Sequence, residues 1–107
     1  MTQTQKSRRE VLESFVSSKP DDAFARYGLA LECAKLGDYA AAAGHFQHLL
    51  DAHPEYVAGY FQYGQLLART GKVAEARQIL AAGIEAAQVA GDFHARDEAQ
   101  AALQALG

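Results

Sequence analysis

The sequence predicts an all-α protein, a solenoid of helical hairpins with about six helices. The first observation is a periodic pattern, in which side chains of matching size or type recur at one offset along the chain. The offset is 34 in each of these pairs: Gly37 and Gly71, Ala42 and Ala76, Phe46 and Leu80, and Pro20 and Pro54. The second observation is that apolar residues within each period follow the i, i+3, i+4 spacing of helices, whereas no stretch alternates as a strand does. A period of this length indicates a repeat protein.

The first complete unit spans residues 23–56 and is expected to form two helices. The inner positions of its first helix are Leu29, Ala30 and Cys33. Gly37 is expected to end that helix in the left-handed conformation, and Asp38 to cap the next helix. The inner positions of the second helix are Ala42, Phe46, Leu49 and Leu50. Pro54 is expected to end the second helix, because proline cannot continue the hydrogen-bond ladder.

The second unit spans residues 57–90 and repeats the pattern. Its inner positions are Tyr60, Tyr63, Gly64, Leu67, Ala76, Leu80, Gly83 and Ile84. Counting back by one repeat from Phe46 and Leu49 reaches Leu12 and Phe15, which predicts a half-unit helix over residues 5–19 with Leu12 buried.

Beyond Gln88 the offset becomes 36, so that Leu67 corresponds to Leu103. This predicts a last helix over residues 92–106 that caps the solenoid with a polar outer face. The residues expected to point inward are Phe93, Ala99, Leu103 and Leu106. The whole chain, residues 1–107, is therefore predicted to form a single domain.

The pattern resembles the tetratricopeptide repeat (TPR) family, whose units are about 34 residues long. With Ala23 as the first repeat position, Ala42, Phe46 and Pro54 match the family's small, aromatic and proline positions. Arg26 stands where the family often has tryptophan, and Gln88 replaces the terminal proline. The resemblance implies a helical-hairpin solenoid, wound as a right-handed superhelix, with two full repeats flanked by half-repeats.

The composition excludes several classes of function. Hydrophobic residues make up 50% of the chain and charged residues 21%, which fits a folded domain. The formal net charge of −3 leaves no basic stripe for nucleic acid. Apolar runs are far shorter than the roughly 20 residues that span a bilayer, and no secretory signal is recognised at the N-terminus. The single cysteine, Cys33, fits a reducing compartment, so a cytoplasmic protein is expected.

No catalytic, cofactor or metal site is predicted. Cys33 occupies an inner helix position, where an unactivated thiol acts as a small hydrophobe. His45 and His48 are three residues apart on one predicted helix, a spacing that permits a shared metal ion. Both flank inner positions and are expected to meet solvent, so weak metal binding remains a second alternative function.

The resemblance implies that ligands bind along the groove formed by the first helices of the repeats. The candidate groove residues are Phe24, Tyr27, Leu31, Lys35, Tyr56, Phe61, Gln65 and Arg69. Because the inner positions are already filled, the aromatic members of this set lack a partner, and an exposed apolar patch usually marks an interaction site. The lysines and asparagines with which some family members clamp acidic C-terminal tails are missing, since Tyr27, Leu31 and Gln65 occupy those positions.

The leading hypothesis is therefore a non-catalytic scaffold that binds a peptide or helix of a partner protein. We expect that segment to be apolar or amphipathic, with Lys35 and Arg69 at the rim for an acidic flank. An alternative is a subunit that self-associates through its aromatic face, and the chain is expected to be a monomer or a weak homo-oligomer. Two further interpretations stay open: the terminal helices cover the aromatic rings, or the rings line the inner curve of the solenoid.

Overall fold

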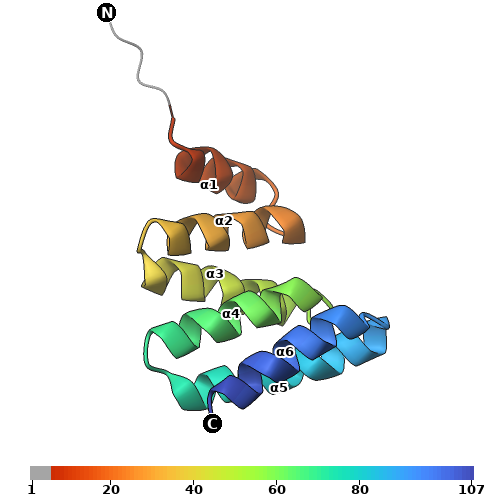
Figure 1. The fold of residues 1–107 in the computed structure, drawn as a ribbon. Helices are drawn as coiled ribbons and strands as arrows, with labels where there is room; N and C mark the ends of the chain where they lie inside the picture. Colours follow the sequence, from red (N-terminus) through yellow and green to blue (C-terminus); the bar gives the residue numbers. More distant parts are fainter. Residues whose placement is uncertain (1–5) are drawn as a thin grey trace, which may run out of the picture.

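A computed structural model describes residues 6–107 and shows six α-helices, with no strand in that part of the chain; α1 to α4 are stacked in chain order, and α6 lies against both α5 and α4 (Figure 1). The helices are α1 (Arg8–Ser18), α2 (Ala23–Lys35), α3 (Tyr39–Ala52), α4 (Val57–Arg69), α5 (Val73–Ala90) and α6 (Phe93–Ala105). The described stack is elongated, with α1 at one end and α5 and α6 at the other. The prediction of an all-α helical repeat is confirmed. Residue 5, the predicted start of the first helix, lies outside the described residues.

The helix ends follow from local sequence. Gly37 and Gly71 both have φ of +82°, which places them in the left-handed region that glycine adopts without steric cost. The Asp38 carboxylate then accepts a hydrogen bond from the Ala41 amide at 3.2 Å and begins α3. Helix α5 runs four residues beyond the end that a one-repeat offset from Ala52 gives, and ends at Gly91 with φ of +72°. This longer helix accounts for the change of offset before α6.

The core is continuous along the stack and contains no buried polar side chain among the described residues. Its largest fully buried side chains are Phe46, Leu29, Leu49, Leu80 and Cys33. Phe46 links three helices, because its ring lies 6.4 Å from that of Tyr27 on α2 and 5.7 Å from that of Tyr63 on α4. These inner positions are buried as the repeat pattern predicts.

Small residues let paired helices approach closely. A Cβ atom on Gly64 would lie 2.5 Å from Leu80 Cδ2, and one on Gly83 would lie 2.6 Å from Tyr60 Cβ. Both glycines therefore hold α4 and α5 together by lacking a side chain. Gly44 on α3 has nothing within 4 Å of the corresponding position and plays no such part.

Several burial predictions at the ends of the stack are wrong. Phe93 is predicted to point inward, but 57% of it is exposed and Arg96 stacks over its ring at 4.9 Å. Leu12 is only partly buried and Phe15 is 45% exposed, although their counterparts Phe46 and Leu49 are buried. The physical reason is that the counterparts are covered by a helix on each side, whereas α1 is packed on one side only.

Candidate functional site

The candidate site lies on the face formed by α2, α4 and α6, the first helices of the hairpins, which contact one another in that order. We call this surface the α2–α4–α6 face. Its helices present small or apolar residues to their partner helices and leave their remaining positions for side chains that meet solvent. The surface is therefore built by three neighbouring helices and not by loops.

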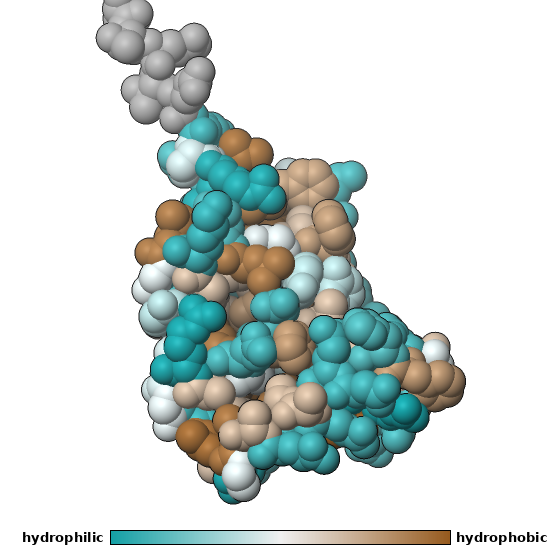
Figure 2. Space-filling model, in the orientation of Figure 1, coloured by the Kyte–Doolittle hydropathy of each residue, from teal (hydrophilic) through white to brown (hydrophobic). Residues whose placement is uncertain are grey.

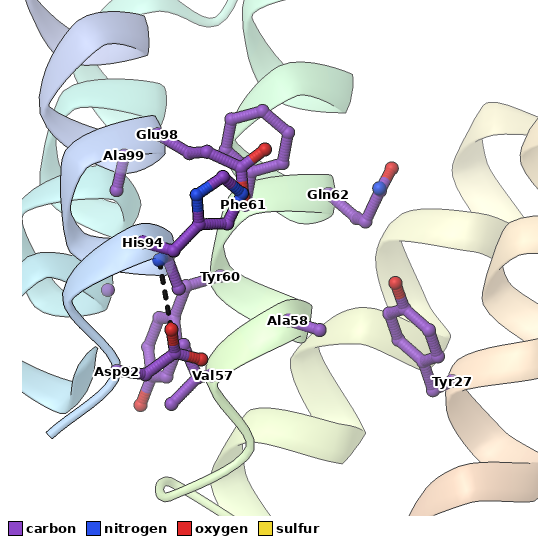
Figure 3. A pocket seen from close by; sticks show the side chains of 12 residues that line it. Tyr27, Val57, Ala58, Tyr60, Phe61, Gln62, Asp92, His94, Glu98 and Ala99 are labelled. Atoms are coloured by element: carbon purple, nitrogen blue, oxygen red, sulfur yellow. Dashed lines mark hydrogen bonds and ion pairs between the residues drawn. The ribbon is translucent and has the colours of Figure 1, made fainter. Parts of the chain in front are cut away.

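A hollow of about 310 Å³ lies between α4 and α6 and reaches Tyr27 of α2 (Figure 3). Its apolar lining is contributed by Tyr27, Val57, Ala58, Tyr60, Phe61, Gly83, Ala95 and Ala99. Its polar lining is contributed by Gln62, Asp92, His94 and Glu98. Asp92 also caps α6, because its carboxylate accepts a hydrogen bond from the Ala95 amide at 3.0 Å. The hollow combines an aromatic wall with an acidic rim.

A second hollow of about 300 Å³ lies farther along the same two helices. It is lined by Gly64, Gln65, Ala68, Arg69, Leu80, Ala102, Ala105 and Leu106. The Arg69 guanidinium also lies 5.7 Å from the centroid of the Tyr39 ring, within the range of a cation–π interaction. The charge at this end of the face is therefore positive, opposite to that of the first hollow.

Tyr27 is both part of the site and part of the core. Its ring lies 5.3 Å from that of Tyr56 and meets Phe46 edge to face. Burial raises the pKa of the Tyr27 hydroxyl, and its hydrogen bond with Gln62 partly offsets that rise. Tyr56, whose pKa burial also raises, supports Tyr27 rather than facing solvent freely. Tyr27 is thus held in a cluster of aromatic rings beneath the first hollow.

The remaining candidates lie elsewhere. Phe24 and Leu31 line a different hollow, between α1 and α2, and 76% of Phe24 is exposed. Lys35 is exposed at the end of α2 and lines none of these hollows. Of the eight candidates that the sequence suggests, only Tyr27, Phe61, Gln65 and Arg69 line the two hollows of the α2–α4–α6 face.

Three polar residues of the first hollow, Asp92, His94 and Glu98, are absent from the candidates that the sequence suggests. The 36-residue offset contains the signal, because it makes His94 the counterpart of Ala58 and Glu98 the counterpart of Gln62. Treating α6 only as a cap hides this correspondence. His94 Nε2 lies 3.8 Å from Glu98 Oε1, one turn along the exposed face of α6.

The two histidines of α3 have separate surroundings. His45 is partly buried, contrary to expectation, and its Nδ1 lies 3.3 Å from Nη1 of Arg26. Burial lowers the pKa of His45, and the Arg26 charge lowers it further. Nδ1 of a neutral His45 therefore accepts a hydrogen bond from Arg26, while His48 is exposed. Within residues 6–107 no three histidine, cysteine or carboxylate side chains are grouped as metal ligands.

The thiol of Cys33 is fully buried, and burial raises its pKa, which leaves it in the unreactive protonated form. Across the described residues, none of the helices has the length and apolar character needed to cross a membrane.

Comparisons with known proteins agree with this architecture. Sequence profiles of the tetratricopeptide repeat match residues 34–107 and residues 9–47. A TPR repeat-containing protein of Pseudomonas aeruginosa is 33% identical over 97 residues, which cover 91% of this chain and 92% of that protein.

Solved structures are similar over most of the chain. The crystal structure of a tetratricopeptide repeat domain protein from Salinibacter ruber is 33% identical, with a TM-score of 0.76 over 79% of this chain and 94% of that one. The solution structure of a protein from Bordetella parapertussis is 30% identical, with a TM-score of 0.81 over 95% of this chain and 89% of that one. The repeat spacing, the glycine contacts, the sequence matches and these likenesses agree. The chain belongs to the tetratricopeptide repeat family.

Proposed function

We propose that the protein is a cytoplasmic, non-catalytic scaffold that binds a peptide or helix of a partner protein on its α2–α4–α6 face. Tetratricopeptide repeat folds commonly mediate protein–protein interaction, and proteins of the family are generally non-catalytic. The observation that carries the proposal is the pair of hollows that follow one another along α4 and α6. Adjacent hollows suit an extended or helical segment that places successive side chains in each.

The charges at the two ends indicate the chemistry of the bound segment. Asp92 and Glu98 lie at the first hollow, and Arg69 lies at the second. A segment with apolar anchors, a basic residue toward Glu98 and an acidic residue toward Arg69 would match both ends. Complementary charges of this kind set orientation and association rate more than affinity. Phe61 supplies the apolar anchor between them.

A selection from a random peptide library tests this proposal even though the partner is unidentified. We expect the selected peptides to shift the backbone resonances of Phe61, Gln65 and Ala102. Phe61→Ala should weaken their binding by roughly thirtyfold, which corresponds to about 2 kcal/mol. Val89→Ala is the matched control, because Val89 is 90% exposed on α5 and lines neither hollow. Peptides whose affinity does not depend on Phe61 would remove this face from the site.

The role proposed for Arg69 in recognising an acidic flank can be tested in the same peptide selection. Arg69→Glu should change the preferred flank of the selected peptides from acidic to basic while Phe61 dependence persists. An unchanged preference would show that Arg69, held on the Tyr39 ring, does not take part in recognition.

Self-association is the alternative, and light scattering over a concentration series decides it. An apparent mass that rises with concentration, and that Phe61→Ala restores to the monomer, would favour a structural subunit over a scaffold. Metal binding by His45 and His48 has less support, because Nδ1 of His45 already faces Arg26.

A further inference from the structure

The end of the stack formed by α1 and α2 carries an open apolar groove. It has a volume of about 420 Å³ and is lined by Arg8, Val11, Leu12, Phe15, Asp22, Phe24, Ala25, Tyr27, Gly28 and Leu31. Three of these residues are large, apolar and exposed: Val11 at 53%, Phe15 at 45% and Phe24 at 76%. Figure 2 shows hydrophobic side chains among hydrophilic ones at this end of the molecule, and hydrophilic ones over much of α6. Another side of α1 is polar, because Lys6, Glu10, Glu13, Ser14, Ser17 and Ser18 line a hollow there, so the apolar residues at this end belong to the groove that α1 shares with α2.

The repeat itself shows what fits such a groove. The second helix of one hairpin and the first helix of the next form a groove of this kind; we call them the host helices, and the helix that packs against both is the guest. Helix α2 is the guest of α3 and α4, and α4 is the guest of α5 and α6. The pair α1 and α2 is the third such groove, and among the described helices none lies in it.

Equivalent residues of the host helices differ in burial according to whether a guest helix is present. Leu12, Phe46 and Leu80 are one repeat apart in succession and form the floors of the three grooves. Phe46 and Leu80 are each 1% exposed because a helix covers them, whereas Leu12 is only partly buried. The α1–α2 groove therefore retains the floor of a helix-binding groove without the helix.

The guest helices share a pattern. On α2 the residues turned toward the host are Tyr27, Ala30 and Cys33, and on α4 they are Phe61, Gly64 and Leu67. Each set is an aromatic, a small and an apolar residue at i, i+3 and i+6. The small residue allows close approach, as the contact between Gly64 and Leu80 shows. A guest of the third groove needs the same three side chains.

The charged residues of the open groove suit a helix that runs parallel to α2. Asp22 lies at the start of α2, beside the place where such a guest would begin, and favours the partial positive charge of a helix N-terminus. Arg8 lies 3.3 Å from Glu32 near the end of α2, where the guest's C-terminal carbonyl groups would lie. Their interior counterparts, Tyr56 and Ala42, carry no charge.

We propose that the α1–α2 groove binds an amphipathic helix of a partner protein, which presents an aromatic, a small and an apolar residue at i, i+3 and i+6 and runs parallel to α2. This interaction completes the half-repeat that α1 begins. It is separate from binding on the α2–α4–α6 face, because the two surfaces share only Tyr27.

A peptide with the sequence of α4, residues 57–69, is the probe, because it carries the guest pattern. A staple that joins positions 58 and 62 should keep it helical, since short isolated helices are marginal in water. Neither position belongs to the aromatic, small and apolar pattern. We expect saturable binding to the intact protein below about 1 mM, with resonance shifts at Leu12, Phe15, Phe24 and Gly28.

Two variants with the same substitution locate the interaction. Phe24→Asp should weaken binding of the stapled peptide at least tenfold, and Val89→Asp should leave it unchanged. Both side chains are largely exposed, so neither change should lower the melting temperature appreciably. Replacing the peptide residue that corresponds to Phe61 by alanine should weaken binding to the same extent as Phe24→Asp.

Three results would overturn the proposal. One is the absence of saturable binding at about 1 mM peptide. Another is binding that Phe61→Ala in the protein weakens and Phe24→Asp does not, which would place the peptide on the α2–α4–α6 face. The third is a sedimentation mass that rises with concentration and returns to the monomer in Phe24→Asp, which would show that a second copy covers the groove.

Discussion

At the scale of single residues, the α4–α5 hairpin closes where a residue without a side chain faces a large one. The clearest case is Gly64, whose missing Cβ makes room for Leu80. We predict that Gly64→Ala destabilises the protein by about 1–3 kcal/mol, because Leu80 must move in a packed core. Gly44→Ala should stabilise it by up to about 1 kcal/mol, since α3 gains helix propensity in open space. Thermal unfolding of both variants checks the pair, and a shift in the same direction would contradict the packing.

His45 provides a prediction about pH. Its pKa is lowered by burial and by Arg26, so the unfolded chain, with a histidine pKa near about 6.5, binds the proton more readily than the folded protein. Stability should therefore be constant above that value and should fall as the pH drops through it. Glu13 opposes this effect, because its charge raises the pKa of His45.

His45→Gln is the matched variant, because glutamine keeps an acceptor for Arg26 and does not titrate. We expect chemical denaturation between about pH 7.5 and pH 5.5 to show a smaller loss of stability for this variant than for the parent. The two proteins differ only at position 45, so the difference between their pH profiles reports on that residue. Equal slopes would mean that His45 is protonated in the folded state as readily as in the unfolded chain.

At the scale of helices, glycines in the left-handed region follow the ends of α2, α4 and α5. Gly71 has φ of +82° between α4 and α5, a conformation that costs other L-residues roughly 1–2 kcal/mol. We predict that Gly71→Ala destabilises the protein by about that amount, although nothing lies within 4 Å of the added Cβ. Gly71→Asn should cost less, because asparagine tolerates this region better. Melting temperatures in the order Gly, Asn, Ala are expected, and any other order would contradict a backbone origin.

The interior helices could be predicted from the sequence, and the surroundings of the end helices could not. Matching at the repeat offset identifies Phe46 and Leu80 as inner positions because each lies between two neighbouring helices in the repeat. The same matching assigns Leu12 and Phe15 to the core, yet both are incompletely covered. Periodicity records which side of a helix is apolar, but it does not record whether a neighbour packs against that side.

Within the candidate site, too, some positions could be predicted from the sequence and others could not. Tyr27 and Phe61 are one repeat apart, and both line the first hollow. The contribution of His94 and Glu98 depends on a change of offset that arises where α5 is lengthened before Gly91. The repeat position of Phe24 predicts a residue of the groove formed by the first helices, but Phe24 is 76% exposed and lines the hollow between α1 and α2.

At the scale of the whole molecule, the stack has well-covered middle helices and sparsely covered ends. Helix α4 buries six residues, whereas α1 buries only Val16 and α6 buries only Ala99. In a solenoid each unit is stabilised mainly by its neighbours, so units at the ends can open without unfolding the rest. The apolar α1–α2 groove therefore belongs to the part of the fold that should open most readily, and a bound helix would stabilise it.

We predict that native-state hydrogen exchange is graded along the chain. Amides of α3 and α4 should exchange only through global unfolding, whereas those of α1 and α6 should exchange through local opening at lower free energy. Val16→Ala should speed exchange in α1 and leave α4 and α5 unchanged at low denaturant. The stapled helix should slow exchange in α1 more than in α6, since it covers only the α1–α2 end. Equal exchange free energies in all six helices would instead mean that the stack unfolds as one cooperative unit, whose ends are no weaker than its middle.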